Sequence, residues 1–221
     1  MFSIALDGPA GAGKSSIARK IAERLRIIHV DTGAMYRSIA FYCIKNGVDT
    51  SDIQKVESLL PEISIELSFT EDGQRIFINK EDVTDKIRTS DVSMGASNVS
   101  SIPKVREFLL NNQRELAAKH SLIMDGRDIG TVILPDASVK IFLTASAEIR
   151  AERRLKEYIA DGVNISFDEV LADVIKRDKQ DMERKTAPLK QADDAILADT
   201  SSMDFDESVE YLLNIITERT K

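Results

Sequence analysis

The sequence predicts an α/β fold in which a five-stranded parallel sheet is covered by helices on both faces. Three observations support this prediction. Five short apolar runs alternate with segments of helical periodicity, which is typical of a parallel sheet buried on both faces. A stretch that alternates polar and apolar residues interrupts this order and predicts an inserted β-hairpin. A long charged stretch in the C-terminal third predicts a further pair of helices.

Composition is that of an ordinary globular protein with one main core. The chain has 221 residues, of which 43% are hydrophobic, and we expect a single domain over residues 1–221. The net charge is −7, and residues 191–221 supply −6 of it through eight acidic and two basic side chains. The near-neutral remainder argues against a nucleic-acid partner, because proteins that bind nucleic acid usually carry a basic face.

Cysteine content and hydropathy indicate the compartment. Cys43 is the single cysteine, which excludes an intrachain disulfide and suits a reducing environment. No apolar run approaches the length of a membrane span, and the N-terminus continues directly into a predicted strand rather than a signal peptide. We therefore expect a cytoplasmic protein with no membrane partner, and we expect a monomer.

The first element is a buried strand over residues 2–6 that continues into a glycine-rich loop. The loop, Gly8-Pro-Ala-Gly-Ala-Gly-Lys-Ser15, matches the phosphate-binding pattern G-x-x-x-x-G-K-S/T. Its backbone N–H groups and the N-terminus of the next helix are suited to surround phosphate oxygens. A glycine-rich surface turn is the alternative, but it does not explain the buried strand. We expect nucleoside triphosphate to bind the loop residues Gly8, Pro9, Ala10, Gly11, Ala12, Gly13, Lys14, Ser15 and Ser16.

Two side chains of this loop have expected chemical roles. Lys14 would reach the β- and γ-phosphates and is the first candidate catalytic residue. The Ser15 hydroxyl would ligate Mg²⁺, although Ser16 also carries a hydroxyl and the assignment between the two stays open.

The remaining elements follow in order. Apolar runs predict the other four strands at residues 27–30, 122–124, 139–143 and 196–198. Helical periodicity predicts helices at residues 17–25, 34–45, 52–60, 103–119 and 206–219, and a pair within 147–186 broken near Asp161-Gly162. Residues 62–98 form the predicted insert, with a hairpin that turns at Asp72-Gly73 and short polar helices around 85–100.

Two arginines follow the ends of predicted strands beside the loop. Arg37 comes six residues after the strand-end residue Asp31, and Arg127 comes two residues after Asp125. Because the carboxyl ends of parallel strands meet at one edge of the sheet, ligands bind there. Guanidinium groups bind phosphate oxygens bidentately, so this pair predicts a second phosphate group facing the first. The alternative for each is an arginine that lies on the surface or forms an ion pair.

The other sequence features that could indicate a binding site are weaker evidence. Asn79-Lys-Glu-Asp82 matches the N-K-x-D pattern that reads guanine in switch GTPases, but it follows the inserted hairpin and no D-x-x-G segment accompanies it. His29 and His120 lack a third metal-ligand partner at motif spacing, and we expect structural or exposed roles for them. Cys43 is expected to be a small core residue.

Four segments together resemble the bacterial cytidylate kinases, a family of the nucleoside monophosphate kinase superfamily with a P-loop kinase fold. They are Gly8–Ser15, Asp31-Thr-Gly-Ala-Met-Tyr-Arg37, Gly126-Arg-Asp-Ile-Gly-Thr-Val132, and Arg177-Asp178 with Ala187-Pro-Leu189. Their order and spacing agree across nearly the whole chain. The resemblance implies phosphoryl transfer from ATP to CMP or dCMP with Mg²⁺. It also implies that residues 62–98 bind the nucleoside monophosphate and that residues 150–162 form a helical lid.

The resemblance also implies roles for individual residues. Arg37 and Arg127 would hold the CMP phosphate, and Thr32, which stands where the family often has Ser, would also bind CMP. Cytosine would be read by Ser97, Arg106 and Asp128, and the pentose would contact Arg177 and Asp181. Arg153 and Arg184 would be catalytic arginines that meet the transferring phosphoryl group from the lid. Uracil carries a carbonyl in place of the cytosine amine and would leave buried acceptors unpaired.

Two other functions remain as alternatives at this point. The chain could be a kinase for another small acceptor, such as a different nucleotide or shikimate. It could also be a nucleotide-dependent switch that signals through a partner, although the missing D-x-x-G segment argues against this. The sequence leaves the choice between CMP and dCMP open.

Overall fold

The computed structural model of the protein describes residues 1–70, 73–160 and 162–220. Asp72 and Asp161 lie outside these ranges, so the turn predicted at Asp72-Gly73 and the helix break predicted at Asp161-Gly162 are not described. Elsewhere the order of strands and helices follows the predicted alternation.

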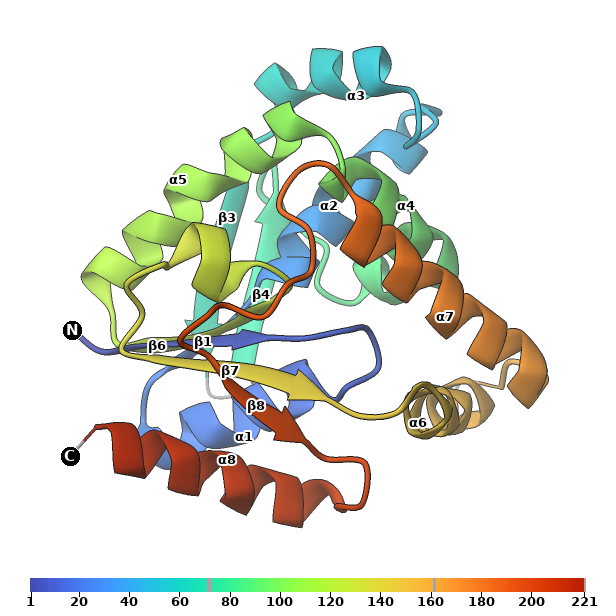
Figure 1. Cartoon of the computed structure of the whole chain (residues 1–221). Coiled ribbons are helices and arrows are strands. Elements are labelled where there is room, and N and C mark those ends of the chain that lie inside the picture. The colour runs from blue at the N-terminus through green and yellow to red at the C-terminus, as the bar shows by residue number, and fades with distance from the viewer. Residues whose placement is uncertain (71–72, 161, 221) are drawn as a thin grey trace.

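A five-stranded parallel sheet forms the centre of the molecule (Figure 1). Its order is β2-β6-β1-β7-β8, and each neighbouring pair is parallel, as predicted. The strands are β1 (Ser3–Asp7), β2 (Ile28–Asp31), β6 (Leu122–Gly126), β7 (Val139–Thr144) and β8 (Ile196–Asp199). In register, Asp7 lies beside Gly126, and Asp31 lies beside Asp125. The polar strand ends therefore meet at one edge of the sheet.

Helices cover both faces of this sheet. The amphipathic helices α1 (Lys14–Leu25) and α8 (Phe205–Arg219) pack on one face, where Ile17, Ile21 and Leu212 share a core with strands β1 and β7. On the other face, α5 (Pro103–Lys119) and the hairpin strand β3 (Ile65–Thr70) contribute partly buried side chains to the core of β6. Figure 1 shows α1 and α8 below the sheet and α5 above it.

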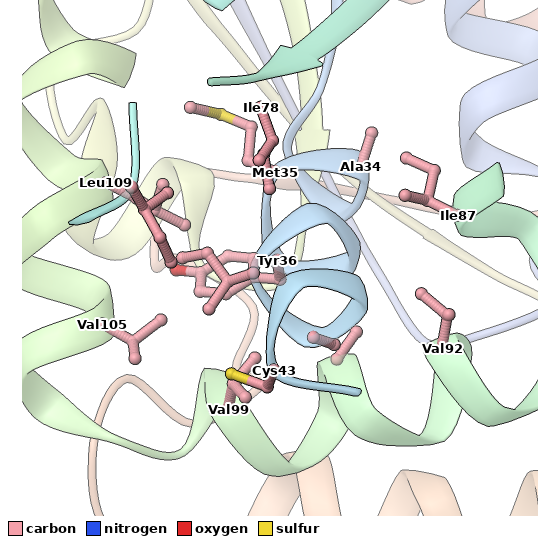
Figure 2. Close-up of a cluster of buried hydrophobic side chains, with 14 of the residues drawn as sticks. Ala34, Met35, Tyr36, Cys43, Ile78, Ile87, Val92, Val99, Val105 and Leu109 are labelled. Carbon is pink, nitrogen blue, oxygen red and sulfur yellow. The ribbon is translucent and has the colours of Figure 1, made fainter. Parts of the chain in front are cut away.

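The insert builds on a second core. Here α2 (Thr32–Lys45) packs against α4 (Ser90–Ser100), and the core extends to α5 and to the antiparallel sheet (Figure 2). That sheet consists of β3, β4 (Gly73–Ile78) and a third short strand, β5 (Glu81–Asp82), which the sequence pattern did not predict. Short helices α3 (Ile53–Leu59), η1 (Leu60–Glu62) and η2 (Lys86–Arg88) complete the region. Residues 62–98 thus share a core with α2 and α5, and their boundaries as a subdomain stay a prediction.

The N-K-x-D segment has a structural explanation. Asn79 and Lys80 both have positive φ, 48° and 68°, and they form the tight turn between β4 and β5. The Asn79 amide also ties this turn to the start of the hairpin, since Oδ1 accepts from Ser64 N at 2.8 Å and Nδ2 donates to Glu62 O at 2.9 Å. Asp82 instead accepts from Arg75 and Thr84.

The predicted helix pair consists of α6 (Ala147–Ala160) and α7 (Phe167–Glu183), which enclose a small core of their own around Ala151, Val170 and Val174. A one-turn π-helix at Ile129–Ile133, η3, follows β6 and was not predicted. Among the helices described, none combines the length and apolarity needed to cross a membrane.

Candidate functional site

A cleft of about 610 Å³ lies at the carboxyl ends of the central strands. It is lined by the loop residues Ala10, Gly11, Gly13, Lys14, Ser15 and Ser16. The same cleft is lined by Thr32, Arg37, Ser97, Arg106, Arg127, Asp128, Arg177, Asp181 and Arg184. The fold therefore brings the predicted phosphate-binding loop and every predicted acceptor residue to one cavity. Gly8, Pro9 and Ala12 of the loop are buried and do not line the cleft, and neither does Arg153.

The loop requires glycine where its backbone approaches other strands. Gly8 has φ 150°, and a Cβ there would lie 2.0 Å from the Leu143 carbonyl oxygen of β7. Gly13, with φ 87°, sets the backbone that starts α1. Lys14 is buried, and its ammonium donates to Pro9 O at 2.7 Å, so it is held within the loop. Burial, and then the nearby charge of Arg127, hold the pKa of Lys14 well below its usual value.

Ser15 faces a carboxylate from the neighbouring strand. Its hydroxyl donates to Asp125 Oδ2 at 2.8 Å, and His29 Nε2 lies 2.6 Å from Asp125 Oδ1. Burial disfavours the charged imidazole, but the hydrogen bond and charge of Asp125 outweigh it and raise the pKa of His29. A hydroxyl and a buried carboxylate are oxygen ligands suited to Mg²⁺, which usually keeps water and substrate phosphate as its other ligands. The donor set at Ser15 and Asp125 therefore fits Mg²⁺ better than the exposed Ser16 does.

Arg37 is held at the end of β2. Its Nη2 donates to Asp31 Oδ2 at 2.7 Å, while Asp31 Oδ1 accepts from Ala34 N at 2.9 Å and caps α2. Burial opposes the ionisation of Asp31, but the charges of Arg37 and His29 outweigh it and lower the pKa of Asp31 to about 2. Thr32, at the start of the same helix, donates its hydroxyl to Asp125 O at 2.7 Å. The α2 terminus is thus bonded directly to the end of β6.

A second arginine group joins α7 to the segment after β6. Arg127 Nε donates to Asp181 Oδ2 at 2.8 Å, and Arg127 lowers the pKa of Asp181 against the effect of burial. Arg177 lies beside them, and burial together with the charge of Arg127 lowers its pKa to about 10. Among the described residues, Arg177 Nε and Arg37 Nε are buried donors with no partner in the protein. Such unsatisfied donors in a cleft indicate an anionic ligand.

Asp128 lies between two further arginines. Arg106, from α5, bonds to Asp128 Oδ2, and Arg184, after α7, donates to Asp128 Oδ1 at 3.4 Å. Arg106 also donates to Ser100 O at 3.2 Å and lies over the Tyr36 ring, 5.5 Å from its centroid. Near them Ser97 Oγ is buried and, within the described part of the chain, has no partner. Arg184 thus bonds to a predicted base-reading residue, and its catalytic role stays a prediction.

Three arginines of α6 have different surroundings. Arg153 donates to Ala12 O, Thr200 O and Met203 O at 3.3, 2.9 and 3.4 Å and does not line the cleft. Arg154 lines the cleft and donates to the Tyr158 hydroxyl. Arg150 joins Ala10 O to Asp178 of α7 through hydrogen bonds of 3.0 and 2.6 Å. The catalytic role of Arg153 stays a prediction, and Arg154 is the α6 arginine that reaches the cleft.

The family model described as cytidylate kinase matches residues 4–218. The chain belongs to the cytidylate kinase family. Among curated members, the cytidylate kinase of Geobacillus kaustophilus is 48% identical over 99% of this chain and 97% of its own length. That of Carboxydothermus hydrogenoformans is 47% identical over 96% of each chain. The cytidylate kinase of Bacillus subtilis is 42% identical over 100% of this chain and 98% of its own. The resemblance drawn from four motifs is confirmed over the full length.

One solved structure agrees with the fold. An uncharacterized protein from Eubacterium ventriosum superimposes with a TM-score of 0.53 over 98% of this chain and 99% of its own, at 15% identity. At this identity the likeness shows the fold alone.

Several polar residues of this cytidylate kinase site were not assigned a role from the sequence. Asp125 was visible as a strand-end acid, and its position beside the loop follows once β6 is known to neighbour β1. The bonds of His29 to Asp125 and of Arg150 to Asp178 join segments far apart in the chain, so no local pattern indicates them.

Proposed function

We propose that the protein transfers the γ-phosphoryl group of ATP to CMP or dCMP, giving ADP and CDP or dCDP. One observation carries this proposal. The cleft that contains the phosphate-binding loop also contains Asp128 between Arg106 and Arg184, and the buried Ser97 hydroxyl, which has no partner in the described part of the chain. A donor site for phosphate and a polar pocket suited to a nucleobase therefore share one cavity.

The loop half would bind ATP. Backbone N–H groups of the loop and the N-terminus of α1 surround the phosphates, and Lys14 reaches the oxygens between which charge moves. Ser15 and Asp125 would hold Mg²⁺, which would neutralise negative charge on the phosphate groups. A phosphate oxygen would offer the Lys14 ammonium a stronger acceptor than Pro9 O, its partner at 2.7 Å.

The arginine half would bind the acceptor nucleotide. Arg37 and Arg127 hold the CMP phosphate, and each is already oriented by a carboxylate, Asp31 or Asp181. Arg177 and Asp181 contact the pentose. No catalytic base is needed, because the CMP phosphate is already an anionic nucleophile near neutral pH. Positioning and charge stabilisation supply most of the catalysis.

Selection of cytosine follows from the hydrogen-bonding groups available. The Asp128 carboxylate and the Ser97 hydroxyl accept from the exocyclic amine, and Arg106 donates to the ring acceptors. Uracil presents a carbonyl at the same place, so the buried acceptors would face another acceptor. Such unpaired polar groups discriminate strongly between substrates.

The test is a comparison of acceptors. We expect turnover with CMP and dCMP to exceed that with UMP, AMP, GMP and shikimate. We also expect ATP hydrolysis to be slow without an acceptor and fast turnover to require CMP. Preference for any other acceptor contradicts the specificity, and a nucleotide switch would hydrolyse ATP at the same rate with and without CMP.

We propose separately in which compartment the enzyme works and how many copies of the chain it contains. The single cysteine, Cys43, is buried and suits the reducing cytoplasm. We expect a monomer there, which light scattering on the purified protein at micromolar concentration would test.

A further inference from the structure

Asp7 is the last residue of β1 and directly precedes the phosphate-binding loop, yet its carboxylate bonds to a distant segment. Oδ1 accepts from Ile129 N, and Oδ2 accepts from Gly130 N, each at 2.7 Å. The side chain is 5% exposed, so water does not compete for these bonds. The residue that introduces the donor loop is therefore bonded to the segment that follows the acceptor residues Arg127 and Asp128.

The two N–H groups lie at the start of the π-helix, where backbone donors have no partner within the turn. The first bonds of the turn are donated farther along, by Val132 N and Ile133 N to Asp128 O at 2.9 and 3.2 Å. An aspartate at the N-cap usually accepts from these free N–H groups with its own side chain. Asp128 occupies the N-cap but makes no such bond. Asp7 supplies the acceptors instead.

This division of roles leaves the Asp128 carboxylate available to the cleft. Both of its oxygens bond to arginines, Arg106 and Arg184, at the predicted base-reading position. If Asp128 had to cap its own turn, its carboxylate could not face these arginines. The Asp7 bonds therefore fix both the start of the turn and the direction of the Asp128 side chain.

The ionised Asp7 carboxylate is costly at this place. Burial raises the pKa of Asp7 to about 6, although the two backbone bonds oppose the shift. Among nearby charges, Asp128 raises this pKa and Lys14 lowers it. Lys140, beside Gly130, is paired with Asp194. A buried acid kept at an energetic cost is typical of functional sites.

We propose that Asp7 is a positioning residue for acceptor recognition, because it holds the Asp128 segment so that the Asp128 carboxylate can select the nucleobase. The inference rests on the proposed function, since it takes the base of CMP as the group that Asp128 meets. Asp7 directly precedes the donor loop, yet this proposal gives it a role in the acceptor half of the cleft.

The first test is the isosteric variant Asp7→Asn. An amide keeps one acceptor but turns an NH₂ group toward the second N–H, so the Asp128 segment shifts. We expect kcat/KM for CMP to fall about ten- to hundredfold and the preference for CMP over UMP to shrink, while the KM for ATP changes by less than about twofold. Calorimetric Kd values should show the same split without relying on turnover.

A second variant addresses the same contact from the other side. A Cβ at residue 130 would lie 3.4 Å from Asp7 Oδ2 and 3.1 Å from Lys140 Cδ, so Gly130→Ala should give a smaller defect of the same kind. If Asp7→Asn does not fold, Gly130→Ala still tests whether this contact affects CMP recognition. Asp49→Asn is the matched control, because Asp49 also accepts two hydrogen bonds, from Ser51, but in an exposed loop.

The outcomes separate this inference from the proposed function. Wild-type protein that does not phosphorylate CMP contradicts the proposed function. Wild-type protein that phosphorylates CMP while Asp7→Asn and Gly130→Ala leave the CMP constants unchanged, or impair ATP as much as CMP, contradicts the inference alone.

Discussion

The two halves of the cleft are built in different ways. The donor half takes most of its polar groups from consecutive residues, Gly8–Ser16, and many of them are backbone N–H groups, while Asp125 of β6 adds one carboxylate beside Ser15. The acceptor half takes side chains from α2, α4, α5, α7 and the segment after β6. Its charged groups are bonded to one another in pairs such as Arg37 with Asp31 and Arg127 with Asp181.

This difference determines how each half should respond to substitution. A loop built from backbone groups tolerates changes elsewhere but not added Cβ atoms, and its chemistry depends on few side chains. A pocket built from buried ion pairs loses more than one group when a partner is removed, because the other charge is left unpaired. We therefore expect donor-side substitutions to act on the chemical step and acceptor-side substitutions to act on binding.

The largest effect should come from Lys14→Ala. The ammonium acts on charge that moves between phosphates, so kcat should fall about a hundred- to thousandfold, with a much smaller change in the KM for CMP. Steady-state kinetics with each substrate varied would measure this. Lys20→Ala is the control, because Lys20 lies on the same helix but is exposed and paired with Glu23. An equal loss in kcat and in CMP affinity would contradict the expectation that donor-side substitutions act mainly on the chemical step.

The next effect should come from Arg127→Ala. The substitution removes a phosphate-binding group and leaves buried Asp181 without its partner, so kcat/KM for CMP should fall about a hundredfold. The dissociation constant of ATP should change little, which equilibrium binding would show. Arg219→Ala, at the exposed end of α8, controls for the loss of an arginine. Unchanged turnover of CMP would mean that the acceptor phosphate binds elsewhere.

The same contrast explains what the sequence could predict. The five strands, most helices and the donor loop are predicted by local patterns, and the structure confirms the strands and helices. The strand-end positions of Arg37 and Arg127 predict a second phosphate site, but the base- and pentose-binding roles came only through the family resemblance, because those residues are scattered along the chain. The bonds of Asp7 to Ile129 and of Asp125 to His29 join residues about a hundred positions apart, and no local periodicity encodes them.

A third prediction concerns the contact between the halves and the pH dependence of stability. The pKa of Asp7 is about 6 in the folded protein and about 3.8 when unfolded, so between these values the folded state binds more protons. The stability that protonated Asp7 contributes is fully present below about pH 3.8 and is lost as the pH rises through about 6. Asn does not titrate. The free energy of unfolding of the wild type minus that of Asp7→Asn should fall by about 2–3 kcal/mol between pH 4 and pH 7.5.

Urea denaturation at a series of pH values would measure this difference. The charged neighbours Asp128 and Lys14 are present in both proteins, so the subtraction isolates the contribution of Asp7. If this difference in the free energy of unfolding does not change with pH, the pKa of Asp7 is not raised in the folded protein.

The smallest expected effect separates two adjacent arginines of α6. Successive residues of a helix point about 100° apart, so the sequence alone does not decide which of Arg153 and Arg154 meets the cleft. Arg154 lines the cleft, so Arg154→Ala should lower kcat about tenfold with little change in Tm. Arg153 bonds to the carbonyls of Ala12, Thr200 and Met203, so Arg153→Ala should lower Tm and raise the KM for ATP. The reverse result, a loss of kcat at unchanged Tm for Arg153→Ala alone, would support the predicted catalytic role of Arg153 and require its side chain to turn into the cleft during turnover.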